Sequence, residues 1–323
     1  MFINIIRTLL SLKKRNDYPM YSMTYYGDYA FDEFLTKGMT KDEDLMEFIQ
    51  NRFAKKMSFD IPKGGCTAFL AKNTNGELLY ARNYDFPTTP SLVLQTKPLS
   101  GYASISIVDM MALGYTKDNL PSGISKKLPL LAAPYLPFDG LNEKGLAVSI
   151  LQVPKTKLSH DPDKITLNTT TAVRLMLDKT ATVDEAIALL KKYNVYFSID
   201  VYCHYFIADQ TGKSVILEFY DGKMHVIEED IASNFYACSG VGLEDEHDTP
   251  DPNQRYHKAK ETLAKQNNIL SLEETAKLLC DLGMYYKGEN ILQWSVIYNL
   301  TSLSGMVFTG RKLSEPYYFQ VKT

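Results

Sequence analysis

The stretch GGCTAFLAKNTNGELLYARNYDF, residues 64–86, decides the fold of this chain. It contains two apolar, aromatic runs, CTAFLAK and ELLYARNYDF, which meet at the sequence NTNG of residues 73–76. Two such runs around a turn rich in Asn and Gly predict a β-hairpin. The hairpin brings Arg82 and Asp85 back beside Cys66, so that a thiol, a cation and a carboxylate share one end of a sheet.

The sequence after this hairpin alternates between strand and helix patterns. Apolar runs predict strands at 92–96, 102–110, 146–153, 201–229, 294–300, 305–311 and 317–321. Helix patterns cover 169–179, 182–193, 255–266 and 272–282, the second opened by Thr182 and Glu185 and the last by Ser271 and Glu274 in capping-box spacing. The many hairpin-like turns favour antiparallel sheets over a doubly wound parallel sheet. The chain is therefore expected to be an α+β protein with helices packed on the faces of its sheets.

The first 65 residues differ from the rest in composition and pattern, because they are rich in charged residues and have helical periodicity. Thr40 and Glu43 have capping-box spacing and predict a helix from 40 to 57, which Pro62 separates from the hairpin. The start, MFINIIRTLLSLKKRN, places its basic residues after the apolar run, which reverses the order of a secretory signal. A short amphipathic helix is expected there, or an upstream extension of a chain that begins near Met20 or Met23.

Composition excludes several classes of protein. Hydrophobic residues make up 45% and charged residues 23%, which is typical of a globular chain and excludes a disordered or collagenous one. The 35 basic and 38 acidic residues give no excess of positive charge for a nucleic-acid partner. No apolar run is long enough to cross a bilayer. The four cysteines form no CxxC pair, which favours a reducing compartment and hence a cytoplasmic location.

The common catalytic and metal-binding motifs are absent from the sequence. It has no GxSxG, GxxxxGK[ST] or HExxH, and its five histidines are scattered without metal spacing, so neither a metal nor a cofactor is expected. The acidic stretch 244–251 lacks the glycine and spacing of a calcium loop and is interpreted as a solvated loop. Cys203, Cys238 and Cys280 are interpreted as small structural hydrophobes. Cys66 is the exception because of its expected neighbours.

These residues resemble the choloylglycine hydrolase family, linear-amide hydrolases of the N-terminal-nucleophile superfamily. CTAF at 66–69 and the run 76–86 are similar to the family's first motif, and the spacing of Cys66, Arg82 and Asp85 matches. DGLNEKGL at 139–146 is similar to its second motif. Later likenesses are Asn234 after a strand, Arg255 within QRY, and the closing run 294–300. The resemblance covers nearly all of residues 66–323.

The resemblance implies a fold and a domain organisation. The fold is an αββα four-layer sandwich with two stacked, mainly antiparallel sheets. Unlike bile salt and penicillin V hydrolases, this chain has 65 residues before its Cys, as in the propeptide-bearing acyltransferases of penicillin biosynthesis and acid-ceramidase-like amidases. Residues 1–65 are therefore expected to be a helical pro-segment, cleaved between Gly65 and Cys66, and residues 66–323 a single catalytic domain. Family members also suggest a homotetramer.

The resemblance also implies roles for individual side chains. Cys66 is expected to be the nucleophile, with its own α-amine as the base, since a free amine titrates near neutral pH. Arg82 would favour the thiolate and Asp85 would orient the amine. Asn234 is the expected oxyanion donor, and Gln152 a second donor or substrate contact. Asn142 and Arg255 are expected to contribute supporting hydrogen bonds around the site.

Several alternatives stay open at this point. An acyltransferase would use every residue just named, and a non-catalytic binding protein on the same scaffold is a weaker alternative. A papain-like enzyme is weaker again, because no Cys opens a helix ahead of a paired His and Asn. Candidate substrates are small N-acyl amides, namely conjugated bile salts, penicillin V, N-acyl homoserine lactones and N-acyl amines. Gln152 matches neither the Asn of bile salt hydrolases nor the Tyr of penicillin V hydrolases. The apolar run 129–138 suits an acyl pocket and core packing equally.

Overall fold

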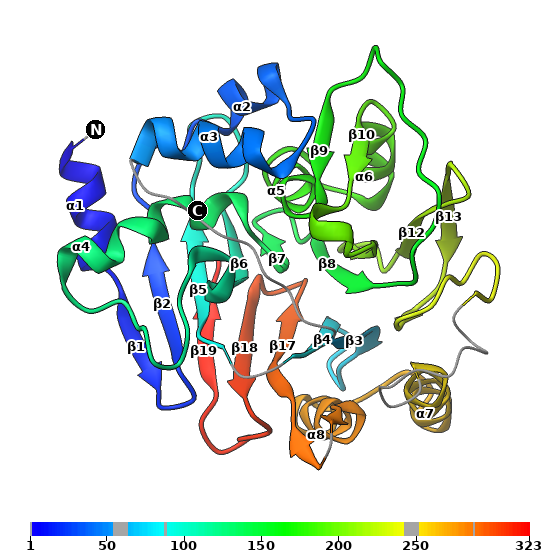
Figure 1. Ribbon diagram of the computed structural model, residues 1–323. Coiled ribbons are helices and arrows are strands. Elements are labelled where there is room, and N and C mark those ends of the chain that lie inside the picture. The colour runs from blue at the N-terminus through cyan, green and yellow to red at the C-terminus, as the bar shows by residue number, and fades with distance from the viewer. Residues whose placement is uncertain (1, 54–63, 87–88, 242–251, 287) are drawn as a thin grey trace.

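The computed structural model describes residues 2–53, 64–86, 89–241, 252–286 and 288–323, and shows two β-sheets stacked face to face between helices (Figure 1). The expected acidic loop at 244–251, the end of the helix expected at 40–57, and Pro62 lie outside these residues. The α+β class and the stacked, mainly antiparallel sheets agree with the sequence analysis.

The larger sheet has nine strands in the order β1-β2-β5-β6-β7-β8-β11-β12-β13. All neighbours are antiparallel except β2 and β5, which pair in parallel. The bounds are β1 Lys13–Asn16, β2 Met20–Thr24, β5 Ser91–Thr96, β6 Ser104–Asp109, β7 Asp139–Asn142, β8 Ala147–Gln152, β11 Cys203–Ala208, β12 Ser214–Tyr220 and β13 Lys223–Glu228. Sequence patterns predicted β5, β6, β8 and the β11–β13 meander.

The smaller sheet has six strands in the order β14-β3-β4-β17-β18-β19, all antiparallel. The bounds are β14 Ile231–Ala232, β3 Gly65–Lys72, β4 Leu78–Asp85, β17 Leu292–Asn299, β18 Ser304–Thr309 and β19 Tyr317–Gln320. The predicted hairpin is confirmed as β3–β4. Its turn is closed by the Asn73 side chain, which accepts from the N–H groups of Asn75 and Glu77, and Gly76 takes a φ of 81° there.

Alternation along β3 explains the layers, because successive side chains point to opposite faces. Ala68 and Leu70 belong to the core between the two sheets. Phe69 and Ala71 belong to a second core beneath α7 (Pro252–Lys265) and α8 (Leu272–Leu282). Helices α5 (Thr169–Lys179) and α6 (Val183–Leu190) lie on the side of the larger sheet away from α7 and α8 (Figure 1). The result is the expected four-layer αββα arrangement.

The helices predicted after Cys66 are confirmed, and so are their caps. Thr182 accepts from the N–H of Glu185, and Ser271 and Glu274 form a reciprocal capping box. Two short strands, β9 (Thr166–Asn168) and β10 (Asn194–Tyr196), pair in parallel beside α5, and β15 (Tyr285–Tyr286) and β16 (Glu289–Asn290) form a small separate pair. No helix in the described ranges combines the length and apolar character that crossing a membrane requires.

The N-terminal segment departs from the helical expectation. It does contain α1 (Phe2–Leu10), α2 (Phe31–Lys37) and α3 (Asp42–Phe53), but residues 13–24 form β1 and β2 at the edge of the larger sheet. The expected Thr40–Glu43 box is also wrong, because Thr40 donates its N–H and hydroxyl to Asp44 instead. The segment is thus built into the same sheet as strands from the rest of the chain. The sequence pattern missed this because β2 is buried on both faces and does not alternate.

Candidate active site

The thiol expected to carry the chemistry lies at the start of β3, and the hairpin register sets its neighbours. Cys66 pairs with Tyr84, Ala68 with Arg82, and Gly65 with Asp85. The Cys66 side chain is buried, and its Sγ accepts a hydrogen bond from Nη2 of Arg82 at 3.4 Å. The predicted meeting of thiol, cation and carboxylate is therefore present at one end of the smaller sheet.

The Arg82 guanidinium is fully buried, and its charge is compensated by Asp139. Its Nη1 pairs with Oδ2 of Asp139, and its Nη2 also donates to the carbonyl of Ile150 at 3.0 Å. Asp139 accepts further bonds from Nε1 of Trp294 at 3.1 Å and from the Tyr298 hydroxyl. A buried cation needs such a partner. Asp139 began the second motif but received no role from the sequence, because its partner is distant along the chain.

Asn234 and Arg255 surround the backbone of Cys66. The side-chain oxygen of Asn234 accepts from the Cys66 N–H at 2.7 Å and from Nη2 of Arg255 at 2.7 Å. Nη1 of Arg255 donates to the Cys66 carbonyl at 2.6 Å. Because a guanidinium only donates, the Asn234 atom facing it must be the oxygen. The Asn234 amide NH₂ then faces the Gln152 carbonyl, to which it donates at 2.7 Å.

Asp85 is a buried carboxylate with one oxygen available. Its Oδ1 accepts from the Met284 N–H at 2.8 Å, while Oδ2 has no hydrogen-bond partner among the described residues. Burial raises the pKa of Asp85 to about 6, although the nearby Arg255 lowers it. At neutral pH the group is therefore ionised and has an acceptor to spare.

In the intact chain, burial has the largest effect on the pKa of the Cys66 thiol. It raises the pKa of Cys66 above its usual value, and the charge of Arg82 only partly offsets this effect. Arg82 was expected to favour the thiolate, but its charge does not offset the effect of burial while the chain is intact. The thiol is protonated at neutral pH while Gly65 and Cys66 remain joined.

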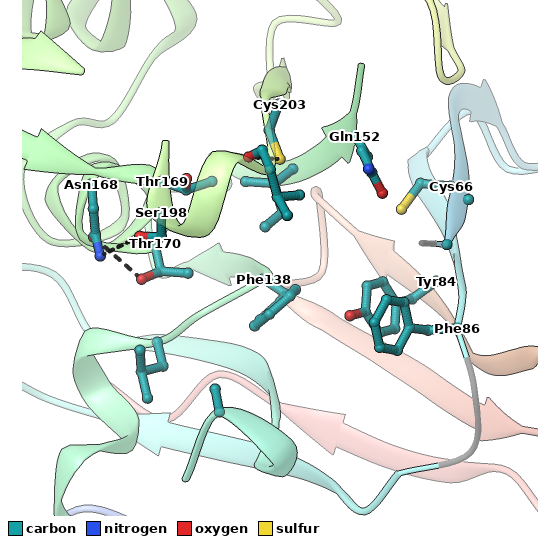
Figure 2. Close-up of a pocket in the computed structure, with 16 residues that line it drawn as sticks. Cys66, Tyr84, Phe86, Phe138, Gln152, Asn168, Thr169, Thr170, Ser198 and Cys203 are labelled. Atoms are coloured by element: carbon teal, nitrogen blue, oxygen red, sulfur yellow. Dashed lines mark hydrogen bonds between the residues drawn. The ribbon is translucent and has the colours of Figure 1, made fainter. Parts of the chain in front are cut away.

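A cavity that is partly open to solvent extends from this thiol between the two sheets and the helices over the larger one (Figure 2). Its apolar and aromatic walls are formed by Tyr84, Phe86, Phe138, Ile150, Leu136 and Ala112. The Gln152 side chain lies on the same side of the cavity as Cys66 in Figure 2, and no hydrogen bond engages its amide group among the described residues. Of the apolar run 129–138, Leu136 and Phe138 reach the cavity and the rest packs in the core.

The far end of the cavity is polar and rests on the N-terminal segment. Asn168 caps α5 and donates to the Ser198 hydroxyl at 3.0 Å (Figure 2). That hydroxyl donates in turn to Asp42 of α3 at 2.6 Å, and Asp42 also accepts from the N–H of Ile199. Ile199 has a φ of 48°, a conformation that such contacts stabilise. Residues before the expected cleavage point thus hold one wall of the cavity, which the sequence did not reveal.

Asn142 does not line the cavity, and its hydrogen bonds, expected to support the site, are directed elsewhere. Its NH₂ donates to the carbonyls of Leu177 and Thr180, and its oxygen accepts from the N–H groups of Lys144 and Leu146. No donor is left for a substrate. Asn142 therefore fixes the β7–β8 turn against the end of α5.

The two glycines before Cys66 are required by space. A Cβ on Gly65 would lie 2.1 Å from the sulfur of Met284, and one on Gly64 would lie 2.6 Å from the carbonyl oxygen of Asp85. Neither glycine has a φ in the left-handed region, so close packing accounts for them and backbone conformation does not. Their role is to let the peptide before Cys66 pass between β4 and Met284.

Replacing Gly65 by Ala should slow the expected cleavage between Gly65 and Cys66 by roughly tenfold, because the added methyl displaces this peptide from its tightly packed position. Mass spectrometry of samples taken over time measures the rate. The double variant Gly65→Ala/Met284→Ala removes the obstructing sulfur and should recover most of it. Cleavage of Gly65→Ala at the wild-type rate would show that this packing is irrelevant.

No group of three or more His, Cys, Asp or Glu side chains in the described ranges is arranged to bind a metal ion. His204 is buried and pairs with Glu218 at 3.0 Å, and Glu218 accepts from the N–H groups of Ala237 and Cys238. These contacts fix the segment that follows Asn234. His204 thus has the structural surroundings that its strand position suggested.

Comparison with known proteins adds a family and a fold. The profile of the linear amide C–N hydrolases, choloylglycine hydrolase family, matches residues 66–234. A mutant conjugated bile acid hydrolase from Clostridium perfringens is 16% identical with a TM-score of 0.55, and the match covers 79% of this chain and 92% of that one. Penicillin V acylase from Agrobacterium tumefaciens is 16% identical with a TM-score of 0.57, over 79% of this chain and 86% of that one. A search of curated sequences found no significant match. The family match begins at Cys66.

Proposed function

The chain belongs to the choloylglycine hydrolase family of linear amide C–N hydrolases, and from this premise we propose that it cleaves small N-acyl amides with Cys66 as an N-terminal nucleophile. The observation that carries the proposal is the placement of the Cys66 thiol. It lies at one end of an apolar cavity, 3.4 Å from the Arg82 guanidinium, on a residue whose N–H and carbonyl are both bound by side chains.

Activation is proposed to be intramolecular. The Cys66 sulfur attacks the Gly65 carbonyl carbon, the peptide C–N bond breaks, and its nitrogen takes a proton to become the α-amine of Cys66. Water then opens the resulting thioester, which leaves a carboxylate on Gly65 and restores the thiol. Asn234 and Arg255 support this step by fixing the backbone of Cys66 on both sides of its Cα.

In the cleaved enzyme the new α-amine is proposed to act as the base. Asn234 already accepts from the Cys66 nitrogen, and the available Oδ2 of Asp85 offers a second acceptor for an amine with more hydrogens. The amine takes the thiol proton, the sulfur attacks the substrate carbonyl, and the proton passes to the leaving nitrogen as the acyl-enzyme forms. Water completes the hydrolysis.

Oxyanion stabilisation is assigned to amide groups beside the thiol. The Asn234 NH₂ is bound to the Gln152 carbonyl in the uncut chain, so it must turn toward the substrate or share its second hydrogen. The Gln152 side chain faces the cavity and supplies another donor. Removal of one such donor typically costs about 10²–10³ in rate.

Cleavage should accelerate with pH, because the attacking species is the thiolate and burial raises the pKa of Cys66. Below that pKa the thiolate fraction increases about tenfold per pH unit. The logarithm of the cleavage rate should therefore rise linearly from pH 6.5 to pH 8.5 in freshly synthesised chain. A rate that levels off near pH 7 would mean that the thiol is already ionised, and this would contradict the raised pKa that burial gives Cys66.

The two fragments should remain associated after cleavage. Residues 2–53 contribute β1 and β2 to the larger sheet and bury Met20, Tyr29, Phe34 and Leu45. The Tyr29 hydroxyl donates to Asp178 of α5 at 2.6 Å. We therefore expect both fragments to elute together in gel filtration and to separate only in denaturant. A catalytic fragment that elutes alone and stays active would show that residues 1–65 are a discarded pro-segment.

The apolar cavity favours substrates with an apolar acyl group. The test is hydrolysis of four substrate classes: conjugated bile salts, penicillin V, N-acyl homoserine lactones and fatty N-acyl amines. Each is measured with and without an added amine or thiol acceptor. Release of free acid supports the amidase, and acylated acceptor supports the transferase alternative. Absence of turnover on all four classes by cleaved protein contradicts the proposal. The homotetramer suggested by the resemblance stays a prediction for gel filtration.

A further inference from the structure

Helix α1 has two apolar faces, and only one of them packs against the protein. Ile5 and Leu9 contact the core, and Thr8 is fully buried beside them. Four other side chains lie in solvent, with exposed fractions of 74% for Phe2, 73% for Ile3, 41% for Ile6 and 67% for Leu10. At 3.6 residues per turn these four share an arc of about 100°. A surface helix normally turns a polar face outward, so this exposed face is unusual.

Helix α4 (Gly123–Lys127) extends the exposed face. Its Ile124 is 70% exposed, and Lys127 at its end donates to the carbonyl of Leu9 at 3.3 Å. Figure 1 shows the two helices side by side at the blue N-terminal corner of the molecule. We call this patch, formed by Phe2, Ile3, Ile6, Leu10 and Ile124, the α1–α4 surface. Exposed apolar side chains on two neighbouring helices are typical of interaction sites.

The charges around the α1–α4 surface are mostly positive. Residues 2–16 contain four basic residues and no acidic one. Arg7 is exposed next to the apolar arc of α1. Lys13 follows the C-terminal end of that helix, and Lys126 lies on the neighbouring helix α4. The exposed Asp28 lies near α1, since Gly27 packs against Asn4 of that helix, and the exposed Asp17 is paired with Lys14. An apolar helix face bordered by cations suits an anionic, apolar partner.

We propose that the α1–α4 surface binds the interface of an anionic lipid bilayer, with α1 lying in the plane of the membrane. Phe2, Ile3, Ile6 and Leu10 enter the boundary between headgroups and acyl chains, while Arg7, Lys13 and Lys126 contact lipid phosphates. A second copy of the chain is a poorer occupant, because a symmetric contact would bring these cations against their own equivalents. This inference concerns attachment to lipid and does not depend on the proposed chemistry.

The test is co-sedimentation of the full chain, tagged at its C-terminus, with lipid vesicles. Vesicles of phosphatidylcholine are compared with vesicles containing about one-third phosphatidylglycerol. We expect at least about tenfold stronger binding to the anionic vesicles, weakened by high salt, because salt screens the headgroup charges. Binding to neither kind of vesicle would overturn the proposal.

Variants locate the binding surface. The variant Phe2→Ser/Ile3→Ser/Ile6→Ser/Leu10→Ser should lose at least about tenfold in vesicle binding. The matched control Leu99→Ser/Tyr318→Ser removes exposed apolar side chains from other elements and should bind as the wild type does. In case serines unfold α1, the variant Arg7→Gln/Lys13→Gln/Lys126→Gln keeps its apolar face and should lose the preference for anionic lipid. Unchanged binding by the serine variant, or a wild-type dimer that this variant converts to monomer, would overturn the proposal.

Discussion

A Cys66→Ala variant will remain a single uncut chain and will lose amide hydrolysis by about 10⁴-fold or more, the loss typical when a covalent nucleophile is removed. The substitution removes the sulfur that is proposed to attack the Gly65 carbonyl and later the substrate. It changes little else, because Cys66 is a small buried side chain whose sulfur contacts only Arg82 by hydrogen bonding among the described residues. Intact mass and hydrolysis of the best amide substrate measure the two effects.

The control for this variant is Cys203→Ala. Cys203 is also buried and lines the same cavity, and burial raises its pKa as well, but the described contacts give its sulfur only the carbonyl of Val201. It should be cleaved like the wild type, because its sulfur is not the attacking atom. A Cys66→Ala chain that is still cut at Gly65 would mean that an external protease performs the activation, and one that is still active would exclude Cys66 as the nucleophile.

Replacing Arg82 by Met will affect both stability and catalysis. The buried Asp139 loses its ionic partner, which typically costs about 3–5 kcal/mol, or a fall of roughly 5–10 °C in the unfolding temperature. The thiol loses the charge that lowers its pKa, so activity should fall by about 10²–10³. Thermal unfolding and steady-state kinetics measure the two effects separately.

The double variant Arg82→Met/Asp139→Asn separates these two roles. It removes the unpaired charge yet leaves an amide oxygen for Trp294 and Tyr298. Most of the lost stability should return, whereas the activity should stay low because no cation faces the thiol. Recovery of activity together with stability would show that Arg82 acts only as a structural ion-pair partner.

The parts of the site that the sequence predicted are those set by local structure or by a linear motif. One hairpin brings Cys66 beside Arg82 and Asp85, and the four residues of its turn, 73–76, predict that hairpin. Asn234 and Arg255 are far along the chain, and only family resemblance pointed to them. Asn142 lies in an equally recognisable motif, yet its four hydrogen bonds assign it to a turn. A motif alone does not tell a free donor from a satisfied one.

The parts that were missed depend on long-range pairing. Strand β2 pairs in parallel with β5, which is distant in sequence, and its residues Met20–Thr24 carry no alternation that would predict a strand. Asp139 and Asp42 act through partners on other elements, so their roles appear only once the chain is folded. The sequence consequently suggested a helical pro-segment, whereas residues 13–24 form two strands of the larger sheet and Asp42 binds Ser198 and Ile199 at the cavity.

The most direct test of the account is the intact mass of wild-type protein that hydrolyses an amide, measured under denaturing conditions. If Cys66 is the N-terminal nucleophile, two masses will appear, corresponding to residues 1–65 and 66–323, and brief treatment with substrate will add the acyl group to the larger one alone. A single full-length mass from an active preparation would contradict the account, because Cys66 would then have no free amine.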